Sequence, residues 1–101
     1  MKRPDFSALE RSASEVSALL RALGNERRLM LMCTLIEEGE CTAGELGERI
    51  GLSPSATSQH LAKMRDEGLV DSRREAQSVY YRIADPRTKR LISLLKELYC
   101  S

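Results

Sequence analysis

The chain has 101 residues, which allow one domain with a modest hydrophobic core. Its 42% hydrophobic and 31% charged residues are typical of a globular protein and exclude an intrinsically disordered chain. No apolar stretch approaches the roughly 20 residues that a membrane span needs, and residues 1–20 lack the apolar centre of a signal peptide. We therefore expect a single cytoplasmic domain over residues 1–101.

The net charge of +1 is weak evidence for nucleic-acid binding, so the positions of the charges matter more than their sum. Five acidic residues and no basic residue lie in the range Glu37–Glu48. Two basic residues and no acidic residue lie in Ser53–Arg65, and four basic residues accompany one acidic residue in Arg82–Arg90. This segregation fits one basic edge that faces DNA.

A helix is predicted over residues 5–23, because apolar and small residues recur there close to every 3.6 positions. Gly24 should end this helix, and Asn25 should cap a second helix over residues 26–38 that ends at Gly39. The middle of the second helix is apolar almost all round, so we expect it to lie at the centre of the fold.

A helix-turn-helix is predicted over residues 42–68. Thr42 and Glu45 have the spacing of a capping box that starts a short helix. Ser53 can cap the helix that follows, and Pro54 suits its first position because that residue needs no N–H partner.

The second helix of this pair has two unlike faces. Thr57, Leu61 and Met64 recur at helical spacing and should point inward. The opposite face is polar and can hydrogen-bond base edges and phosphates, as glutamine does with adenine and lysine with guanine. The predicted DNA-contacting residues of this helix are Ser53, Ser55, Ser58, Gln59, His60 and Lys63. His60 suits a phosphate or groove contact better than a metal site, because the chain has no second histidine.

A two-stranded β-wing is predicted over residues 69–84, with its first strand starting at Leu69 and Val70. The return strand should turn alternate residues inward, namely Val79, Tyr81 and Ile83. The wing tip is predicted over residues 73–77. Three of its residues could reach phosphates or the minor groove: Arg73, Arg74 and Gln77.

A last helix is predicted over residues 86–100, with leucines on one stripe. This helix and the helix over residues 5–23 have more apolar surface than a small core can cover, which we interpret as a homodimer interface suited to a palindromic operator. The predicted fold is mainly α (α+β). It is a winged helix-turn-helix with about five helices and a two-stranded wing, dimerising through its first and last helices.

The pattern alone leaves other functions open. A polar helix face can simply be solvated, and winged helices also serve as protein-interaction modules. An enzyme is disfavoured, because the chain has no phosphate-binding glycine loop and no motif that places a histidine beside a nucleophile.

Two stretches show a resemblance to a known family: LGNERRLMLMCTL and GELGERIGLSPSATSQHLAKMRDEGLVDSRREAQSVYYRI. They resemble the ArsR/SmtB family of dimeric bacterial repressors, over about residues 16–100. The resemblance implies a cytosolic repressor that binds double-stranded operator DNA as a homodimer and leaves it when an inducer binds.

The three cysteines indicate which class of inducer the chain could sense. Metal-sensing relatives typically have Cys-x-Cys in or beside the helix that follows Thr42, and this chain has no such motif there. One histidine cannot make a nitrogen-rich zinc site, and a thiolate site for arsenic or cadmium would require Cys33, Cys41 and Cys100 to converge. We expect no resident metal and no cofactor.

Cys33 in MLMCTL and Cys100 in LYCS resemble the cysteines of the sulfide-responsive branch of the family, the BigR, SqrR, YgaV and HlyU group. The resemblance implies that these two are the sensing pair and that a low-molecular-weight persulfide or polysulfide is the inducer. Without the resemblance, core packing would be the more common role for a free cysteine such as Cys33. Cys41, expected to be exposed beyond Gly39, would be a spectator. A metal or metalloid, or a general oxidant acting on the same cysteines, stays open as the inducer.

Overall fold

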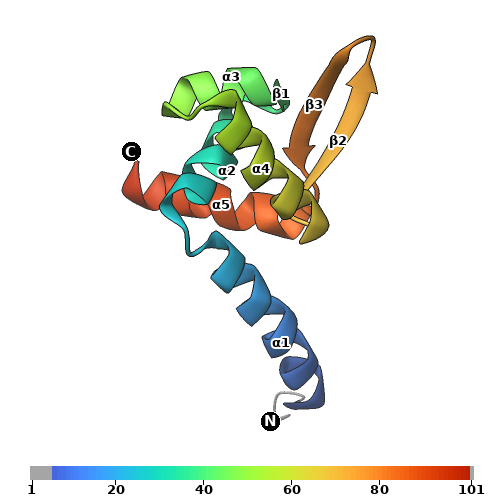
Figure 1. Ribbon diagram of the computed structural model, residues 1–101. Coiled ribbons are helices and arrows are strands. Elements are labelled where there is room, and N and C mark those ends of the chain that lie inside the picture. The colour runs from blue at the N-terminus through green and yellow to red at the C-terminus, as the bar shows by residue number, and fades with distance from the viewer. Residues whose placement is uncertain (1–5, 101) are drawn as a thin grey trace.

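The computed structural model describes residues 6–100, and for Leu9 the backbone alone. Figure 1 shows the elements in this range, which are α1 (Phe6–Leu23), α2 (Glu26–Glu38), β1 (Cys41–Thr42), α3 (Ala43–Ile50), α4 (Pro54–Asp66), β2 (Val70–Glu75), β3 (Ser78–Ile83) and α5 (Pro86–Tyr99). The predicted first, second and last helices end within one residue of the observed ones. Residue 5, the expected start of the first helix, lies outside the described range.

The predicted helix caps are confirmed. The Asn25 side chain accepts a hydrogen bond from the Arg28 N–H at 3.1 Å, at the start of α2. At the start of α3, the Glu45 N–H donates to Thr42 Oγ1 at 3.2 Å and the Thr42 N–H donates to Glu45 Oε1 at 3.0 Å. The Ser53 hydroxyl caps α4. These bonds satisfy backbone donors that a first helical turn leaves open, which is why short polar residues mark the helix starts.

The sheet has three antiparallel strands in the order β1-β3-β2, one strand more than the predicted wing. β1 consists of Cys41 and Thr42, which pair with Tyr81 and Tyr80 of β3. A strand of two residues has no alternation that a sequence could reveal. It forms because β3 has a free edge on that side.

The wing hairpin has a tighter tip than the predicted residues 73–77. Arg73 and Arg74 lie within β2, so Ala76 and Gln77 alone form the turn. Ala76 adopts a positive φ of 54° there. Residues 73–77 at this end of the hairpin are exposed and mostly polar, so their sequence lacks the apolar alternation that indicates a strand.

α2 lies at the centre of the core, as predicted. Its buried face packs with residues of α3, α4, α5 and the base of the wing. The fully buried large residues are Leu31, Met32, Leu35, Leu46, Leu61, Met64, Val70 and Ile92. From β3, Tyr81 and Ile83 pack against this core as predicted. Val79 lies further out along the wing and is half-buried.

α1 projects from the body of the molecule (Figure 1). Its C-terminal end packs against the core through Leu23, whereas Phe6, Val16 and Leu20 expose 64%, 47% and 55% of their surface. On α5, Leu98 exposes 63%. The surplus apolar surface predicted for the first and last helices is therefore present. Among residues 6–100, no helix combines the length and the apolar content that crossing a bilayer requires.

Gly47 allows α3 and α4 to approach closely. A Cβ atom at this position would lie 2.5 Å from Thr57 Oγ1 and 2.8 Å from the Leu52 carbonyl oxygen. We expect Gly47→Ala to lower the free energy of unfolding by about 1–3 kcal/mol in urea denaturation, the usual cost of overpacking. Gly44→Ala is the control, because its nearest heavy atom would lie 3.9 Å away, and it should be neutral or stabilising. Equal effects of the two substitutions would contradict this account.

Candidate DNA-reading surface and cysteine pair

α4 presents the two faces predicted from its sequence. Thr57, Leu61 and Met64 are fully buried against the core. On the other side, His60 is half-buried. The remaining predicted DNA-contacting residues of this helix are exposed, namely Ser53, Ser55, Ser58, Gln59 and Lys63. Most of these side chains are short, so the helix can approach base edges closely.

Ser53 has a structural role in addition to the predicted one. Its hydroxyl oxygen accepts a hydrogen bond from the Ala56 N–H at 3.1 Å, and its carbonyl oxygen accepts one from the Thr57 hydroxyl at 2.9 Å. The Ser53 hydroxyl can still donate its own proton to a phosphate. Capping and phosphate contact are therefore compatible at this helix N-terminus, where the helix dipole attracts anions.

Arg73 is engaged by acidic side chains of the protein itself. Its Nε and Nη2 atoms donate to Glu40 at 2.8 and 3.1 Å, and its Nη1 atom donates to Glu75 at 3.0 Å. Its guanidinium also lies 4.8 Å from the centre of the Tyr80 ring. The hydrogen bonds with Glu40 raise the pKa of Arg73 and lower the pKa of Glu40. Arg73 therefore fixes the wing to the turn between α2 and β1.

Arg74 lies on the opposite face of β2, because neighbouring residues of a strand point to opposite sides. That face also includes Ser72, whose hydroxyl accepts a hydrogen bond from Arg65 of α4 at 3.3 Å. Both Arg74 and Gln77 are exposed. Of the two wing arginines predicted to contact DNA, Arg74 is thus the one on the side of the wing that faces α4.

The three cysteines have unlike surroundings. Cys33 is half-buried on α2, and Cys100 is exposed directly after α5. The expectation that Cys41 is exposed was wrong, since this residue exposes only 3% of its surface. Its strand pairs with β3 opposite Tyr81, and the residue belongs to the buried core cluster.

An ion pair joins the two helices next to Cys33 and Cys100. Lys96 Nζ of α5 lies 2.7 Å from Glu37 Oε1 of α2. Glu37 follows Cys33 by one helical turn, and the Cys100 N–H donates to the Lys96 carbonyl oxygen at 2.8 Å. The ion pair therefore holds the end of α5 beside the second half of α2.

The pKa of the Cys33 thiol is raised, first by burial and then by the charge of the nearby Cys100. Lys96 opposes the rise in this pKa, and Glu37 adds to it. Cys100 directly follows α5, so its thiol lies at the end of the helix that the Lys96–Glu37 ion pair joins to α2. A raised pKa lowers the thiolate fraction of Cys33 at neutral pH, whereas Cys100 is open to solvent. This arrangement suits a pair of thiols in which the exposed Cys100 reacts with a reagent before the half-buried Cys33.

Comparison with known proteins identifies the family. Residues 25–72 match the family described as "Bacterial regulatory protein, arsR family". Over 96 residues the chain is 46% identical to the HTH-type transcriptional regulator YgaV of Escherichia coli (strain K12), with 95% of this chain and 97% of that protein covered. The chain belongs to the ArsR family.

Solved structures of relatives support the same assignment. Reduced HlyU from Vibrio cholerae N16961 has a TM-score of 0.86 at 45% identity, covering 93% of this chain and 98% of that one. The transcriptional repressor BigR from Xylella fastidiosa has a TM-score of 0.84 at 36% identity, covering 97% of this chain and 99% of that one. The homodimeric winged helix-turn-helix DNA-binding domain Mb0332 from Mycobacterium bovis has a TM-score of 0.77 at 30% identity, covering 95% of this chain and 86% of that one.

These findings confirm the resemblance drawn from the sequence, because YgaV, HlyU and BigR are members of the branch that it indicated. This ArsR-family protein is a DNA-binding transcriptional regulator and not an enzyme. Its fold is the predicted winged helix-turn-helix, with a third strand added to the sheet.

Sequence reasoning missed the Lys96–Glu37 and Arg73–Glu40 ion pairs of this ArsR-family regulator. The Lys96–Glu37 pair has a local signal, since Lys96 precedes Cys100 and Glu37 follows Cys33 by one turn each. Opposite charges therefore flank the two thiols at helical spacing. Glu40 has no such signal, because it lies 33 positions before its partner Arg73.

Cys41 has surroundings of its own in this ArsR-family regulator. Within the described range, no three His, Cys, Asp or Glu residues are placed to hold a metal ion. Cys41 borders a cavity of about 290 Å³, together with Glu38, Glu45 and Arg49.

We expect the three thiols to react with iodoacetamide in the order of their exposure: Cys100 first, then Cys33, then Cys41. Burial raises the pKa of Cys33 and of Cys41, so alkylation of both should keep accelerating above the pH at which an ordinary thiol has ionised. Peptide mass mapping over time and pH measures these rates, with urea-unfolded protein as the control. Rapid labelling of Cys41 in the folded protein at neutral pH would contradict its burial.

Proposed function

We propose that this ArsR-family regulator is a dithiol sensor of reactive sulfur. Reduced protein binds operator DNA and represses transcription, and protein with a Cys33–Cys100 bridge releases it. The observation that supports this proposal is the junction of α2 and α5. There, a half-buried thiol and an exposed thiol lie on helices held together by the Lys96–Glu37 ion pair.

The chemistry requires only a persulfide or polysulfide as oxidant. The Cys100 thiolate attacks the outer sulfur of a low-molecular-weight persulfide, forming a protein persulfide and releasing the donor's thiolate. The Cys33 thiolate then attacks the inner sulfur of that persulfide, which closes a disulfide and expels hydrosulfide. Two protein thiols are thereby oxidised, and the transferred sulfane sulfur is reduced to sulfide. A longer donor can leave additional sulfur atoms in the bridge.

We place this regulator in the cytoplasm as a homodimer formed through α1 and α5. The exposed apolar residues of these helices supply the surface, and the Mycobacterium bovis relative of the same fold is homodimeric. A bridge would restrict the position of α5 relative to α2 and so change the separation of the two α4 helices. Half-sites lie about 34–36 Å apart on one face of DNA, so both α4 contacts weaken together. A coupling free energy of about 1–3 kcal/mol is sufficient for a useful switch.

For DNA recognition, we assign base-edge contacts to α4 and phosphate contacts to the wing. Arg74→Ala should lower operator affinity and reduce the salt dependence of binding by roughly one phosphate contact. Arg73→Ala should leave the salt slope nearly unchanged, because this guanidinium is already bound by Glu40 and Glu75. Fluorescence anisotropy across a salt series measures both variants. Identical salt slopes for the two would refute the assignment of Arg74.

The proposed function is tested by measuring the sulfur chemistry and DNA binding on the same samples. Reduced, peroxide-treated and polysulfide-treated protein are each analysed by intact mass and by operator gel shift. We expect release only where mass shows a bridge between Cys33 and Cys100, formed by polysulfide far more readily than by peroxide. Equal response to peroxide would indicate a general oxidant sensor, and release by cadmium or arsenite would indicate a metal or metalloid sensor.

A further inference from the structure

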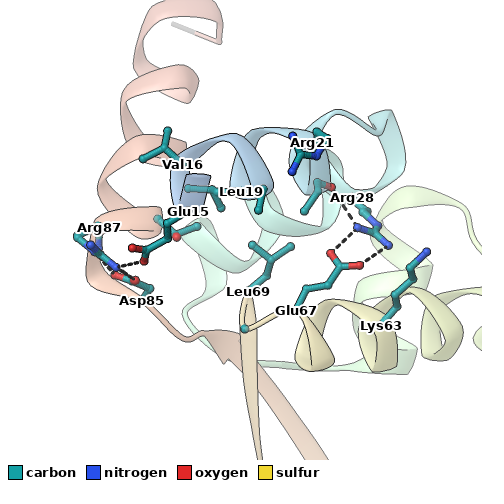
Figure 2. A pocket seen from close by; sticks show the side chains of 14 residues that line it. Glu15, Val16, Leu19, Arg21, Arg28, Lys63, Glu67, Leu69, Asp85 and Arg87 are labelled. Atoms are coloured by element: carbon teal, nitrogen blue, oxygen red, sulfur yellow. Dashed lines mark hydrogen bonds and ion pairs between the residues drawn. The ribbon is translucent and has the colours of Figure 1, made fainter. Parts of the chain in front are cut away.

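One guanidinium connects the ends of three helices. Arg28, near the start of α2, donates from Nη1 to the Ala22 carbonyl oxygen of α1 at 3.2 Å. It also donates from Nη1 and Nη2 to the two carboxylate oxygens of Glu67 at 2.9 and 3.4 Å. Glu67 is the residue that caps the C-terminus of α4. Figure 2 shows this group, with Lys63 of α4 beside it.

Stability alone is a poor explanation for this ion pair. The Arg28 side chain is only 9% exposed and that of Glu67 31%, so both charges lose much of their hydration. In addition, a carboxylate at the C-terminus of a helix is disfavoured by the helix dipole. A buried ion pair is weak evidence for stability, so we consider the geometry that this one imposes.

The Arg28–Glu67 ion pair joins the start of α2 to the last turn of α4, a turn in which Met64 is fully buried in the core. A cavity of about 680 Å³ lies between α1, α4 and α5, and both Lys63 and Glu67 border it (Figure 2). The Glu67 N–H donates to the Lys63 carbonyl oxygen at 3.0 Å, so Glu67 ends the helical turn that includes Lys63. Met64 packs this turn into the core, and the ion pair adds a directed polar contact from the turn to α2 where the cavity leaves space.

We infer that Arg28 is a positioning residue for DNA reading. It sets the direction of α4 relative to α2, and so determines how Gln59 and Lys63 enter the groove. Arg28 is too buried to contact DNA itself. The inference extends to switching, and that part depends on the proposed function. Arg28 and Cys33 lie on the same helix, so a shift of α2 on bridging passes through Arg28 to the DNA-reading helix.

The experiment compares operator DNA with scrambled DNA for the reduced full-length protein. Glu67→Gln keeps the shape of the side chain and removes its charge. We expect it to lower operator affinity about tenfold, the effect of losing one charged hydrogen-bonded contact, and to leave scrambled-DNA affinity unchanged. Arg28→Met should act alike, and Arg28→Lys should recover part of the operator affinity. Thermal unfolding shows whether each variant is folded. If the Arg28 variants are unfolded, the operator affinity of Glu67→Gln alone tests the inference.

Asp66→Asn is the matched control, since it removes the same charge one position earlier at an exposed site. It should leave the ratio of operator to scrambled affinity unchanged. The inference is overturned if folded Glu67→Gln keeps the wild-type ratio, or if Asp66→Asn lowers it equally. Wild-type protein that ignores polysulfide would refute the proposed function, but the comparison of reduced proteins would still decide the role of Arg28. Where wild type does respond, Glu67→Gln should lose most of the affinity difference between reduced and bridged protein.

Discussion

Replacing either Cys33 or Cys100 with serine should leave operator binding intact in the reduced protein and abolish its release by polysulfide. Each substitution removes one end of the proposed bridge and leaves α4 and the wing untouched. In gel shifts, wild-type affinity should fall about 5- to 150-fold after polysulfide treatment, and affinity of either variant should stay within about twofold of its reduced value.

Cys41→Ser is the control for these two substitutions. Cys41 is buried at the sheet edge, so its serine variant should respond to polysulfide like the wild type, at some cost in stability. Release that persists in both Cys33→Ser and Cys100→Ser would exclude the two-thiol mechanism. Loss of release in Cys41→Ser alone would move the sensing site to β1.

Introducing a charge on the exposed apolar face of α5 should dissociate the proposed dimer and abolish high-affinity operator binding. Leu98 exposes 63% of its surface in the isolated chain, so Leu98→Glu should not disturb the fold of the monomer. A monomer engages one half-site at a time and loses the gain from linked binding, which is about a hundredfold or more in affinity. Sedimentation gives the oligomeric state, and anisotropy on palindromic DNA gives the affinity.

Ser93→Glu places the same charge on an exposed polar position of the same helix and serves as the control. It should stay dimeric and bind the operator normally. If Leu98→Glu stays dimeric with unchanged affinity, α5 is not the dimer interface, and the route by which a Cys33–Cys100 bridge would act on α4 is lost.

Features decided by local chemistry could be predicted from the sequence. The caps at Asn25, Thr42 and Ser53 form hydrogen bonds within one helical turn, so short-range patterns reveal them. The two faces of α4 follow from helical periodicity, and Thr57 and Leu61 are buried as expected. The same reasoning gave bounds within one residue for the long helices, because a glycine follows α1 and α2 and a proline begins α5.

Features that depend on contacts distant in sequence could not be predicted. β1 exists only because it pairs with β3, and that pairing buries Cys41. The ion pairs of Arg73 with Glu40 and of Arg28 with Glu67 join residues 33 and 39 positions apart. No periodic pattern connects such residues, so sequence reasoning assigned Arg73 to DNA and assigned Arg28 no role.

The burial of Cys41 limits which products oxidation can form. A polypeptide with three thiols admits three alternative intramolecular cross-links, and a mixture of them would give a population of molecules with different properties. Cys41 and Thr42 pair with the edge strand β3, and the burial of Cys41 there keeps its thiol from reacting with the other two, although the thiol itself is unmodified. Under the proposed mechanism, a chemical signal would thereby link the same two cysteines in every molecule, and a reductant would reverse that link.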